Sequence, residues 1–345
     1  MKFNKIVLDS IERCYCASHL YVDGELKIIL ASEVVDGPCC AYSGTNFEKK
    51  EVLWEKPGGT MSLVPIPGTN GEFLAIQCSY PGFNAKDSKI VWGKYTSNGW
   101  VIKDFISIPY LHRFDILESE GRTFFLGATS CNSRKDRNDW SDPGKVWVCE
   151  MPKTCDEQVS LRPIKDFLLK NHGYWRGSWG GVQAGFVTCD SGIYVFSPPG
   201  KNRDWDITQI LAGQISDVTC IDLDGDGVDE LVTISPFHGN ELFIRKKVSE
   251  TRYETVYRYP NPIDLAHALW AGHFQGVPTV IFGIRMADGE LGYIRYDHEK
   301  KDYKATIIEK DVGTANVSVA NHNGNDIIVA ANHTKNEAAV YIPQS

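Results

Sequence analysis

An internal repeat is the feature that most limits how this chain can fold. Very apolar segments recur along the 345 residues, each preceded by a Gly-containing turn and followed by a loop and a further strand-like segment. Their spacing is about 45 to 50 residues, with one longer step, and this is the length of a four-stranded propeller blade. The seven segments are Leu26–Ala31, Phe73–Cys78, Thr123–Ala128, Gly185–Cys189, Leu231–Ser235, Thr279–Ile284 and Ile327–Ala331.

Seven such repeats predict an all-β fold: a seven-bladed β-propeller with four-stranded antiparallel blades, forming a single domain over residues 1–345. A four-stranded sheet cannot bury both faces alone, whereas sheets packed radially in a closed ring can. The polar segment Cys131–Gly144 accounts for the longer step as an inserted loop, which either covers a site or points away from it. We expect residues 1–12 to add the outer strand of the last blade. A β-sandwich or two small barrels are the alternatives.

Bulk properties exclude some partners. The net charge is −8 and no run of Lys or Arg occurs, so we expect no nucleic-acid partner, because a phosphate-binding surface needs a basic excess. No stretch approaches the ~20 apolar residues that span a bilayer, and the N-terminal segment does not resemble a signal peptide. We therefore expect a cytoplasmic protein with reduced thiols that binds no membrane. Its expected ligand is a small molecule or an oligosaccharide, and its oligomeric state is open.

An acidic loop in the fifth repeat has the pattern of a calcium site. Carboxylates stand at nearly alternate positions, and two glycines between them let the chain curl so that their oxygens converge. The sequence predicts Ca²⁺ (or Mg²⁺) here, since such an ion neutralises the mutual repulsion of the acids; a solvated acidic turn without metal is the alternative. The predicted ligands are the carboxylates of Asp222, Asp224, Asp226 and Glu230 and the backbone carbonyl of Val228.

Polar side chains recur at related positions in several repeats. His112, His172 and His267 fall near the start of a first strand, where the innermost strands of a propeller reach one mouth of its channel. Other polar residues directly follow second strands and should reach the same mouth. These are His238, Arg285 and Asn332, with Glu337 in the same loop as Asn332, while Trp175 and Arg176 add an aromatic and cationic surface suited to a sugar ring.

Two resemblances add to this interpretation. The segment Asp222–Glu230 resembles the FG-GAP and VCBS repeats of integrin-like propellers. Several further segments resemble the propeller domain of the aldos-2-ulose dehydratase family, in which a seven-bladed propeller carries a sugar-dehydrating site with metal ions. Because the chain ends after the seventh repeat, the resemblance implies the elimination step without the isomerisation that two following cupin domains perform in that family. The segments are Leu111–Arg113, Pro236–Gly239, His267–Trp270 and Asn332–Tyr341.

The implied reaction assigns roles to these residues. Removing water from a keto-sugar requires a base, an electrophile for the enolate and an acid for the leaving hydroxyl. We expect His112, His238 and His267 to converge and to share proton transfer or the ligation of a second divalent metal, Zn²⁺ or Mn²⁺. Arg285 or Arg176 would neutralise a carboxylate or the enolate. The expected substrate-binding residues are His172, Trp175, Arg176, Asn332 and Glu337, although each residue taken singly could instead be structural.

Two functions compete at this stage. The first is a metal-dependent carbohydrate lyase or dehydratase that acts by β-elimination on a keto-sugar or uronate at the channel mouth. The second is a non-catalytic, calcium-stabilised propeller that binds carbohydrate or protein, and a propeller that has lost its chemistry would behave in the same way. The fold cannot separate them, because propellers carry out both kinds of function.

Overall fold

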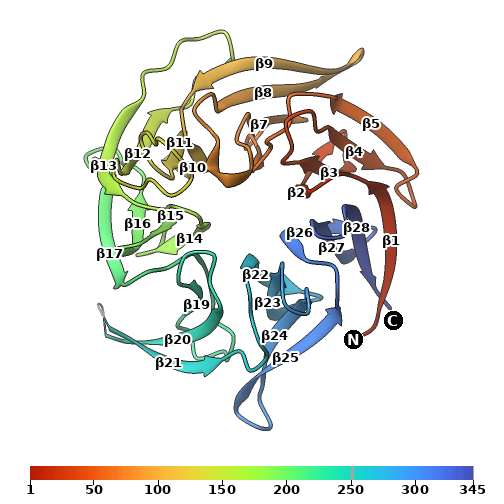
Figure 1. Cartoon of the computed structure of the whole chain (residues 1–345), viewed down its shortest axis with the longest axis vertical. Helices are drawn as coiled ribbons and strands as arrows, with labels where there is room; N and C mark the ends of the chain where they lie inside the picture. Colours follow the sequence, from red (N-terminus) through yellow and green to blue (C-terminus); the bar gives the residue numbers. More distant parts are fainter. Residues whose placement is uncertain (250–251, 345) are drawn as a thin grey trace.

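The computed structural model describes residues 1–249 and 252–344, and these form seven four-stranded antiparallel sheets in a ring (Figure 1). The predicted seven-bladed β-propeller is therefore confirmed. Each of the seven apolar segments lies in the second strand of its blade, except that Cys78 directly follows β7, and Cys131–Gly144 leads from the second strand of blade three to the start of the third. Within the described residues no helix is long and apolar enough to cross a membrane.

The blades follow one another along the chain, and in each blade the first strand is innermost. Blades one to four consist of β2 (Cys14–Val22), β3 (Glu25–Ser32), β4 (Cys39–Ser43) and β5 (Lys49–Trp54); β6 (Leu63–Pro65), β7 (Glu72–Gln77), β8 (Lys89–Thr96) and β9 (Gly99–Ser107); β10 (Leu111–Ser119), β11 (Arg122–Thr129), β12 (Gly144–Glu150) and β13 (Arg162–Leu168); and β14 (Tyr174–Trp179), β15 (Val182–Cys189), β16 (Gly192–Ser197) and β17 (Asp206–Ala212).

The remaining blades have the same order of strands, except that the outer strand of the last blade comes from the N-terminus. Blades five to seven consist of β18 (Asp217–Ile221), β19 (Glu230–Ser235), β20 (Glu241–Ser249) and β21 (Arg252–Arg258); β22 (Ala266–Phe274), β23 (Val277–Ile284), β24 (Leu291–Asp297) and β25 (Asp302–Glu309); and β26 (Thr314–His322), β27 (Asn325–Asn332), β28 (Glu337–Pro343) and β1 (Phe3–Ser10).

The two ends of the chain close the ring. β1 pairs antiparallel with β28, from Phe3 opposite Pro343 to Ser10 opposite Glu337, and the two termini lie close together (Figure 1). The prediction that residues 1–12 supply the outer strand of the last blade is confirmed. Since this strand is hydrogen-bonded to a segment more than 300 residues away, closure is cooperative with the folding of the whole domain.

Packing on both faces explains why the second strands are continuously apolar rather than alternating. In β27, Ile327 and Val329 pack with blade one, in a cluster that includes Ile28. The alternate residue Ile328 packs with blade six, in a cluster that includes Ile281. Successive side chains of a strand point to opposite faces, so a strand that is covered on both sides needs apolar residues at every position.

The direction of the inner strands defines two mouths of the channel. We call the end where inner strands begin and second strands finish the upper mouth, and the opposite end, where hairpins join first to second strands, the lower mouth. His267 at the start of β22 and His238 after β19 therefore lie at the upper mouth. The acidic loop Asp222–Glu230 joins β18 to β19, so it lies at the lower mouth. The two groups of predicted metal ligands are on opposite sides of the propeller.

Candidate functional site

Backbone irregularities in the inner strands turn side chains toward the upper mouth. The pairing register of β2, β10 and β22 with their second strands shifts at the second residue of each, which leaves Tyr15, His112 and His267 as bulged residues. β-Bulges re-aim the side chain that they carry and are common beside active sites. The three residues therefore occupy equivalent positions in blades one, three and six.

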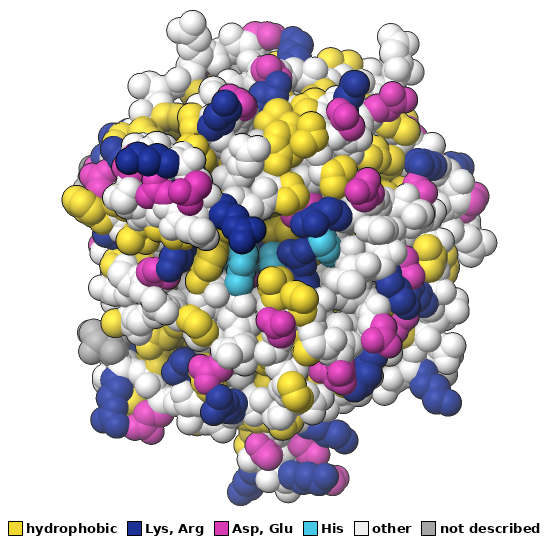
Figure 2. Space-filling view, viewed as in Figure 1, with side chains coloured by type: hydrophobic (Ala, Val, Ile, Leu, Met, Phe, Trp, Pro, Cys, Tyr) yellow, Lys and Arg dark blue, Asp and Glu magenta, His cyan; other side chains and the backbone are white. Residues whose placement is uncertain are grey.

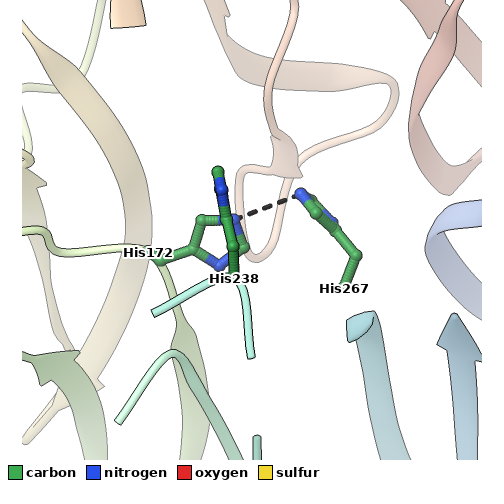
Figure 3. Close-up of side chains that lie close together, drawn as sticks. All are labelled: His172, His238 and His267. Atoms are coloured by element: carbon green, nitrogen blue, oxygen red, sulfur yellow. Dashed lines mark hydrogen bonds between the residues drawn. The ribbon is translucent and has the colours of Figure 1, made fainter. Parts of the chain in front are cut away.

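Three histidines converge at this mouth (Figure 3). His172 precedes β14, His238 follows β19 and His267 lies in β22, and one ring nitrogen from each falls within 4.8 Å of the others. His172 and His267 are buried and His238 is half-buried. The Nε2 atoms of His172 and His267 are 3.1 Å apart, and their rings are nearly perpendicular, at 83°. We call these three residues the histidine cluster.

Hydrogen bonds to the backbone fix which ring nitrogen carries the proton. The Nδ1 atom of His267 lies 2.7 Å from the carbonyl oxygen of Ala315, which can only accept, so Nδ1 is the donor and Nε2 keeps its lone pair. The hydroxyl of Tyr15 lies 3.1 Å from that same Nε2. The single lone pair on Nε2 of His267 therefore faces two neighbours, the hydroxyl of Tyr15 and the Nε2 of His172. A metal ion bound between the two histidines would accept this lone pair.

The spacing of the cluster fits a divalent transition metal. Two imidazoles bound tetrahedrally at Zn–N distances of ~2.05 Å have their nitrogens roughly 3.3 Å apart, close to the 3.1 Å between His172 and His267. The Oγ atom of Ser216 lies 3.3 Å from Nδ1 of His172 and accepts the backbone N–H of His238 at 3.1 Å. Such outer contacts orient metal ligands. Three histidine ligands leave a coordination position for water or substrate.

The electrostatic surroundings keep the histidines neutral, as metal ligation requires. Burial, followed by the charge of Arg285, lowers the pKa of His267 well below its usual range. The same two causes lower the pKa of His238 to about 4. Burial is also the main reason that the pKa of His112 and of His172 is lowered. His112 is a neighbour of the cluster: its Nδ1 lies 3.1 Å from the carbonyl oxygen of His172, which leaves its Nε2 unprotonated.

Aromatic side chains cover one side of the cluster. The ring of Phe83 lies 5.7 Å from that of His238 and 5.6 Å from that of His112. Trp140, from the inserted loop, packs against Phe83 at 5.3 Å and against Phe237 at 5.6 Å. The loop thus covers the site rather than pointing away from it. At the centre of the face shown in Figure 2, histidine side chains lie beside Lys and Arg side chains.

An ionic group lies beside the cluster, at the junction of blades six, seven and one. Glu33 accepts from Nε2 of His333 at 2.6 Å and from Nε of Arg13 at 2.6 Å. Because Glu33 can only accept, Nε2 of His333 is the donor in that pair. Nη2 of Arg285 lies 2.8 Å from Nε2 and 3.0 Å from Nδ1, and of these two nitrogens only the unprotonated Nδ1 can accept from it. Burial raises the pKa of Glu33, but the hydrogen bond and the electrostatic interaction with His333, followed by the charges of Arg285 and Arg13, outweigh it and lower that pKa overall.

A separate cavity of about 420 Å³ lies deeper in the channel. Its lining residues follow those of the upper mouth along each inner strand and include Trp175, Trp270 and Arg176. Arg176 forms an ion pair of 3.2 Å with Asp115. The structure therefore places Trp175 and Arg176 in the channel, away from the aromatic cover of the histidine cluster.

The acidic loop at the lower mouth already holds a cation of the chain. Asp222, Asp224 and Asp226 bring carboxylate oxygens within 4.8 Å of one another, and the positive φ of Gly225 and Gly227 allows this curl. Lys246 from β20 bonds to Asp224 and lies 2.6 Å from Asp226. Glu230 is buried and accepts from the backbone N–H of Leu223 and from the hydroxyl of Tyr303. The aspartates suit Ca²⁺, but Lys246 competes with it.

The remaining predicted site residues, Asn332 and Glu337, make structural contacts within the last blade. Asn332 is buried and its side chain bonds to Thr314, Tyr341 and Glu337. Glu337 forms a 2.5 Å ion pair with Lys5 of β1. Both residues tie β27 and β28 to their neighbours, and the structure does not bring them into the histidine cluster.

The histidines that converge in the structure differ in one member from those predicted from the sequence. His238 and His267 converge as expected, but the third member of the cluster is His172, expected as a substrate-binding residue, while His112 lies beside it. Other neighbours of the cluster were not anticipated. A signal for them was present, because Tyr15 is the second residue of an inner strand, like His112 and His267, and Glu33 and His333 directly follow second strands, like Arg285.

Comparisons with known proteins support the fold alone. No protein-family model matches the chain, and no curated protein matches it. Among solved structures, the chain is similar to the β-propeller domain of Cps50 (Swd1) from Myceliophteria thermophila, with a TM-score of 0.62 and 11% sequence identity. The similarity covers 99% of this chain and 100% of that domain. At this identity the match extends to architecture and not to ligands or activity.

Proposed function

We propose that the chain is a metal-dependent carbohydrate lyase that acts by β-elimination on a keto-sugar or uronate at the upper mouth. The convergence of His172, His238 and His267 carries this proposal, because three neutral imidazoles with an open side form the donor set of a catalytic Zn²⁺ or Mn²⁺ site. The resemblance to the aldos-2-ulose dehydratase propeller is a second, weaker ground. A bound metal ion would supply an electrophile for the oxygen of the developing enolate.

The chain's own residues provide the other elements of the reaction. His112 has its Nδ1 proton committed to the carbonyl oxygen of His172, so its unprotonated Nε2 is the nitrogen that can take the proton α to the carbonyl, although burial lowers its pKa and makes it a weaker base than a free imidazole. Tyr15 is buried, and burial raises the pKa of its hydroxyl to about 12. It therefore stays protonated and can donate to the departing oxygen. Phe83 and Trp140 exclude water from this side.

The acidic loop has a different role in this proposal. A Ca²⁺ ion held by Asp222, Asp224 and Asp226 would stiffen the hairpin between β18 and β19 at the lower mouth. It would take no part in the chemistry, because the histidine cluster lies at the opposite mouth of the propeller. The expectation of a cytoplasmic protein also stays a proposal.

The test is an elimination assay on protein loaded with Zn²⁺ or Mn²⁺, offered keto-sugars and uronates and followed by the ultraviolet absorbance of the unsaturated product. We expect metal-dependent turnover, and we expect His112→Ala to lower kcat/KM by about 100-fold or more. Loaded protein that binds these sugars but forms no unsaturated product would contradict the proposal.

That contrary result would favour the second candidate, a non-catalytic propeller that binds carbohydrate or protein. One observation supports this alternative. The 420 Å³ channel cavity presents Trp175 and Trp270 together with polar groups, and the residues of the histidine cluster do not line it. Aromatic rings with a few polar partners suffice to bind a saccharide without chemistry.

A further inference from the structure

A groove next to the histidine cluster contains an arginine with unused hydrogen-bonding capacity. The groove has a volume of about 560 Å³ and is lined by residues that include Arg13, Arg285 and His333, from blades one, six and seven. Tyr15 connects it to the cluster, since its ring lies 5.1 Å from that of His267 and 6.4 Å from that of His333. The cluster histidines do not line the groove, but the groove lies beside them, and the charge of Arg285 acts on both His238 and His267.

Among the described residues, Arg285 shares its one ion-pair partner, Glu33, with Arg13 and His333. Within residues 1–249 and 252–344, its side-chain hydrogen bonds go only to the neutral ring of His333. The nearest carboxylate, Glu33, is 4.0 Å away and is already bonded to Arg13 and His333. A guanidinium has five N–H donors in a fixed fork that matches a carboxylate. Most of these donors remain for a ligand.

The charge balance of the groove also favours an anion. Arg13 and Arg285 face one buried carboxylate, Glu33. His333 lies between them, and burial together with the charges of Arg285 and Arg13 lowers its pKa more than Glu33 raises it, which favours the neutral ring. Asp311 also lines the groove, but it is exposed to solvent, and no ion pair links it to either arginine in the part of the chain that the structure describes. The inner part of the groove thus carries an excess positive charge.

We propose that this groove is the subsite for a carboxylate of the substrate, so that the ligand of the upper mouth is a sugar acid rather than a neutral keto-sugar. This inference rests on the proposed function and narrows it to uronates or related acids. A base removes the proton α to the carboxylate, the electron pair forms a C=C bond, and the C–O bond at the β carbon breaks as its oxygen takes a proton. Arg285 stabilises the charge that builds on the carboxylate.

Calorimetric titration of the zinc-loaded protein with D-glucuronate tests the subsite, with D-glucose as the neutral probe and inorganic phosphate as a second anion. Absorbance is followed in parallel so that any heat of reaction is separated from binding. We expect glucuronate to bind and glucose to bind at least about tenfold more weakly. Phosphate that binds as tightly as glucuronate would contradict a carboxylate subsite.

Variants of the charged residues test which of them determine the affinity for glucuronate. Arg285→Met should lower the affinity for glucuronate by about 10- to 100-fold, and the more exposed Arg13→Met should lower it by a smaller factor. Glu33→Gln removes the competing carboxylate and should raise the affinity by about threefold or more. Lys335→Met is the matched control: Lys335 lies in the same loop as His333, but it pairs with Glu309 at 3.5 Å and does not line the groove.

The outcomes separate this inference from the proposed lyase activity. If glucuronate binds and responds to these variants but is never eliminated, the subsite stands and the lyase proposal fails. Elimination from neutral keto-sugars, with Arg285→Met binding glucuronate like the unaltered protein, would overturn the subsite and leave the lyase. If Arg285→Met does not fold, the glucuronate affinities of Arg13→Met and Glu33→Gln test the subsite instead. The inference would be overturned if both variants bound glucuronate like the unaltered protein.

Discussion

The Nε2 atoms of His172 and His267 face each other at 3.1 Å although the residues belong to different blades and lie 95 positions apart in the chain. Since Nδ1 of His267 donates to the carbonyl oxygen of Ala315, the Nε2 lone pair of His267 points at its partner. Two imidazoles in this arrangement can share one cation, and the half-buried His238 completes the set.

The structure distinguishes His238 from His112 as a metal ligand. We expect His238→Ala to weaken Zn²⁺ binding by about 100-fold or more, because it removes one of three ligands. His112→Ala should change the affinity by much less, since its ring is outside the cluster. Competition with a chromophoric chelator measures both. An equal loss of Zn²⁺ affinity in the two variants would contradict the assignment of His238, and not His112, as a ligand.

Trp140 should control the rate at which the site exchanges metal. Its contacts with Phe83 and Phe237 close one side of the cluster, and aromatic pairs contribute ~1 kcal/mol each. Trp140→Ala should therefore speed the removal of Zn²⁺ by EDTA by about tenfold. Trp147→Ala in β12, which removes an indole away from the mouth, is the control. An unchanged rate in Trp140→Ala would mean that the loop does not limit access.

Lys246 should set the calcium affinity of the lower mouth. It bonds to Asp224 and Asp226, so an ion has to displace it. We expect Lys246→Met to bind Ca²⁺ at least about tenfold more tightly than the unaltered protein, because a competing charge is removed. Lys247→Met is the neighbouring control, and calorimetric titration with Ca²⁺ measures the difference. If Lys246→Met does not bind Ca²⁺ more tightly, the loop is a salt-bridged turn rather than an ion site.

Asp217 should make the stability of the fold depend on pH. Burial raises its pKa to about 7, although the charge of Arg113 and the N–H of Val218 lower it. The folded state therefore binds a proton that the unfolded chain has lost between about pH 4 and 7. Stability falls as the pH rises through this window, by up to roughly 4 kcal/mol at 1.36 kcal/mol per pKa unit.

Urea unfolding at several pH values measures this slope. Asp217→Asn should flatten it, because the amide does not titrate, while Asp104→Asn on the exposed side of β9 should keep the slope of the unaltered protein. If Asp217→Asn has the same pH dependence as the unaltered protein, then Asp217 ionises in the folded state as it does in the unfolded chain.

The repeat was readable from sequence because it depends on local pattern. A second strand such as Ile327–Ala331 must be apolar at every position, since blades cover both of its faces, and this leaves a signal that recurs with a fixed spacing. The outer strand from residues 1–12 followed from the need to complete the last blade. Candidate residues at strand starts, such as His267, could be chosen on the same positional grounds.

The composition of the site could not be predicted in the same way. Whether His112 or His172 joins His238 depends on how blades three, four and five are rotated about the channel and on the bulge in β10. None of these is encoded in a local pattern. Lys246 was missed as a counterion for a similar reason, because it reaches the aspartates across the blade from β20.

The metal content of the purified, untagged protein, measured by plasma mass spectrometry without exposure to chelators, tests the central claim most directly. The arrangement of His172, His238 and His267 predicts about one equivalent of zinc or manganese per chain, which is lost in the His172→Ala/His267→Ala double variant. Calcium or magnesium alone, or a transition metal that the double variant retains, would contradict a metal site at the upper mouth.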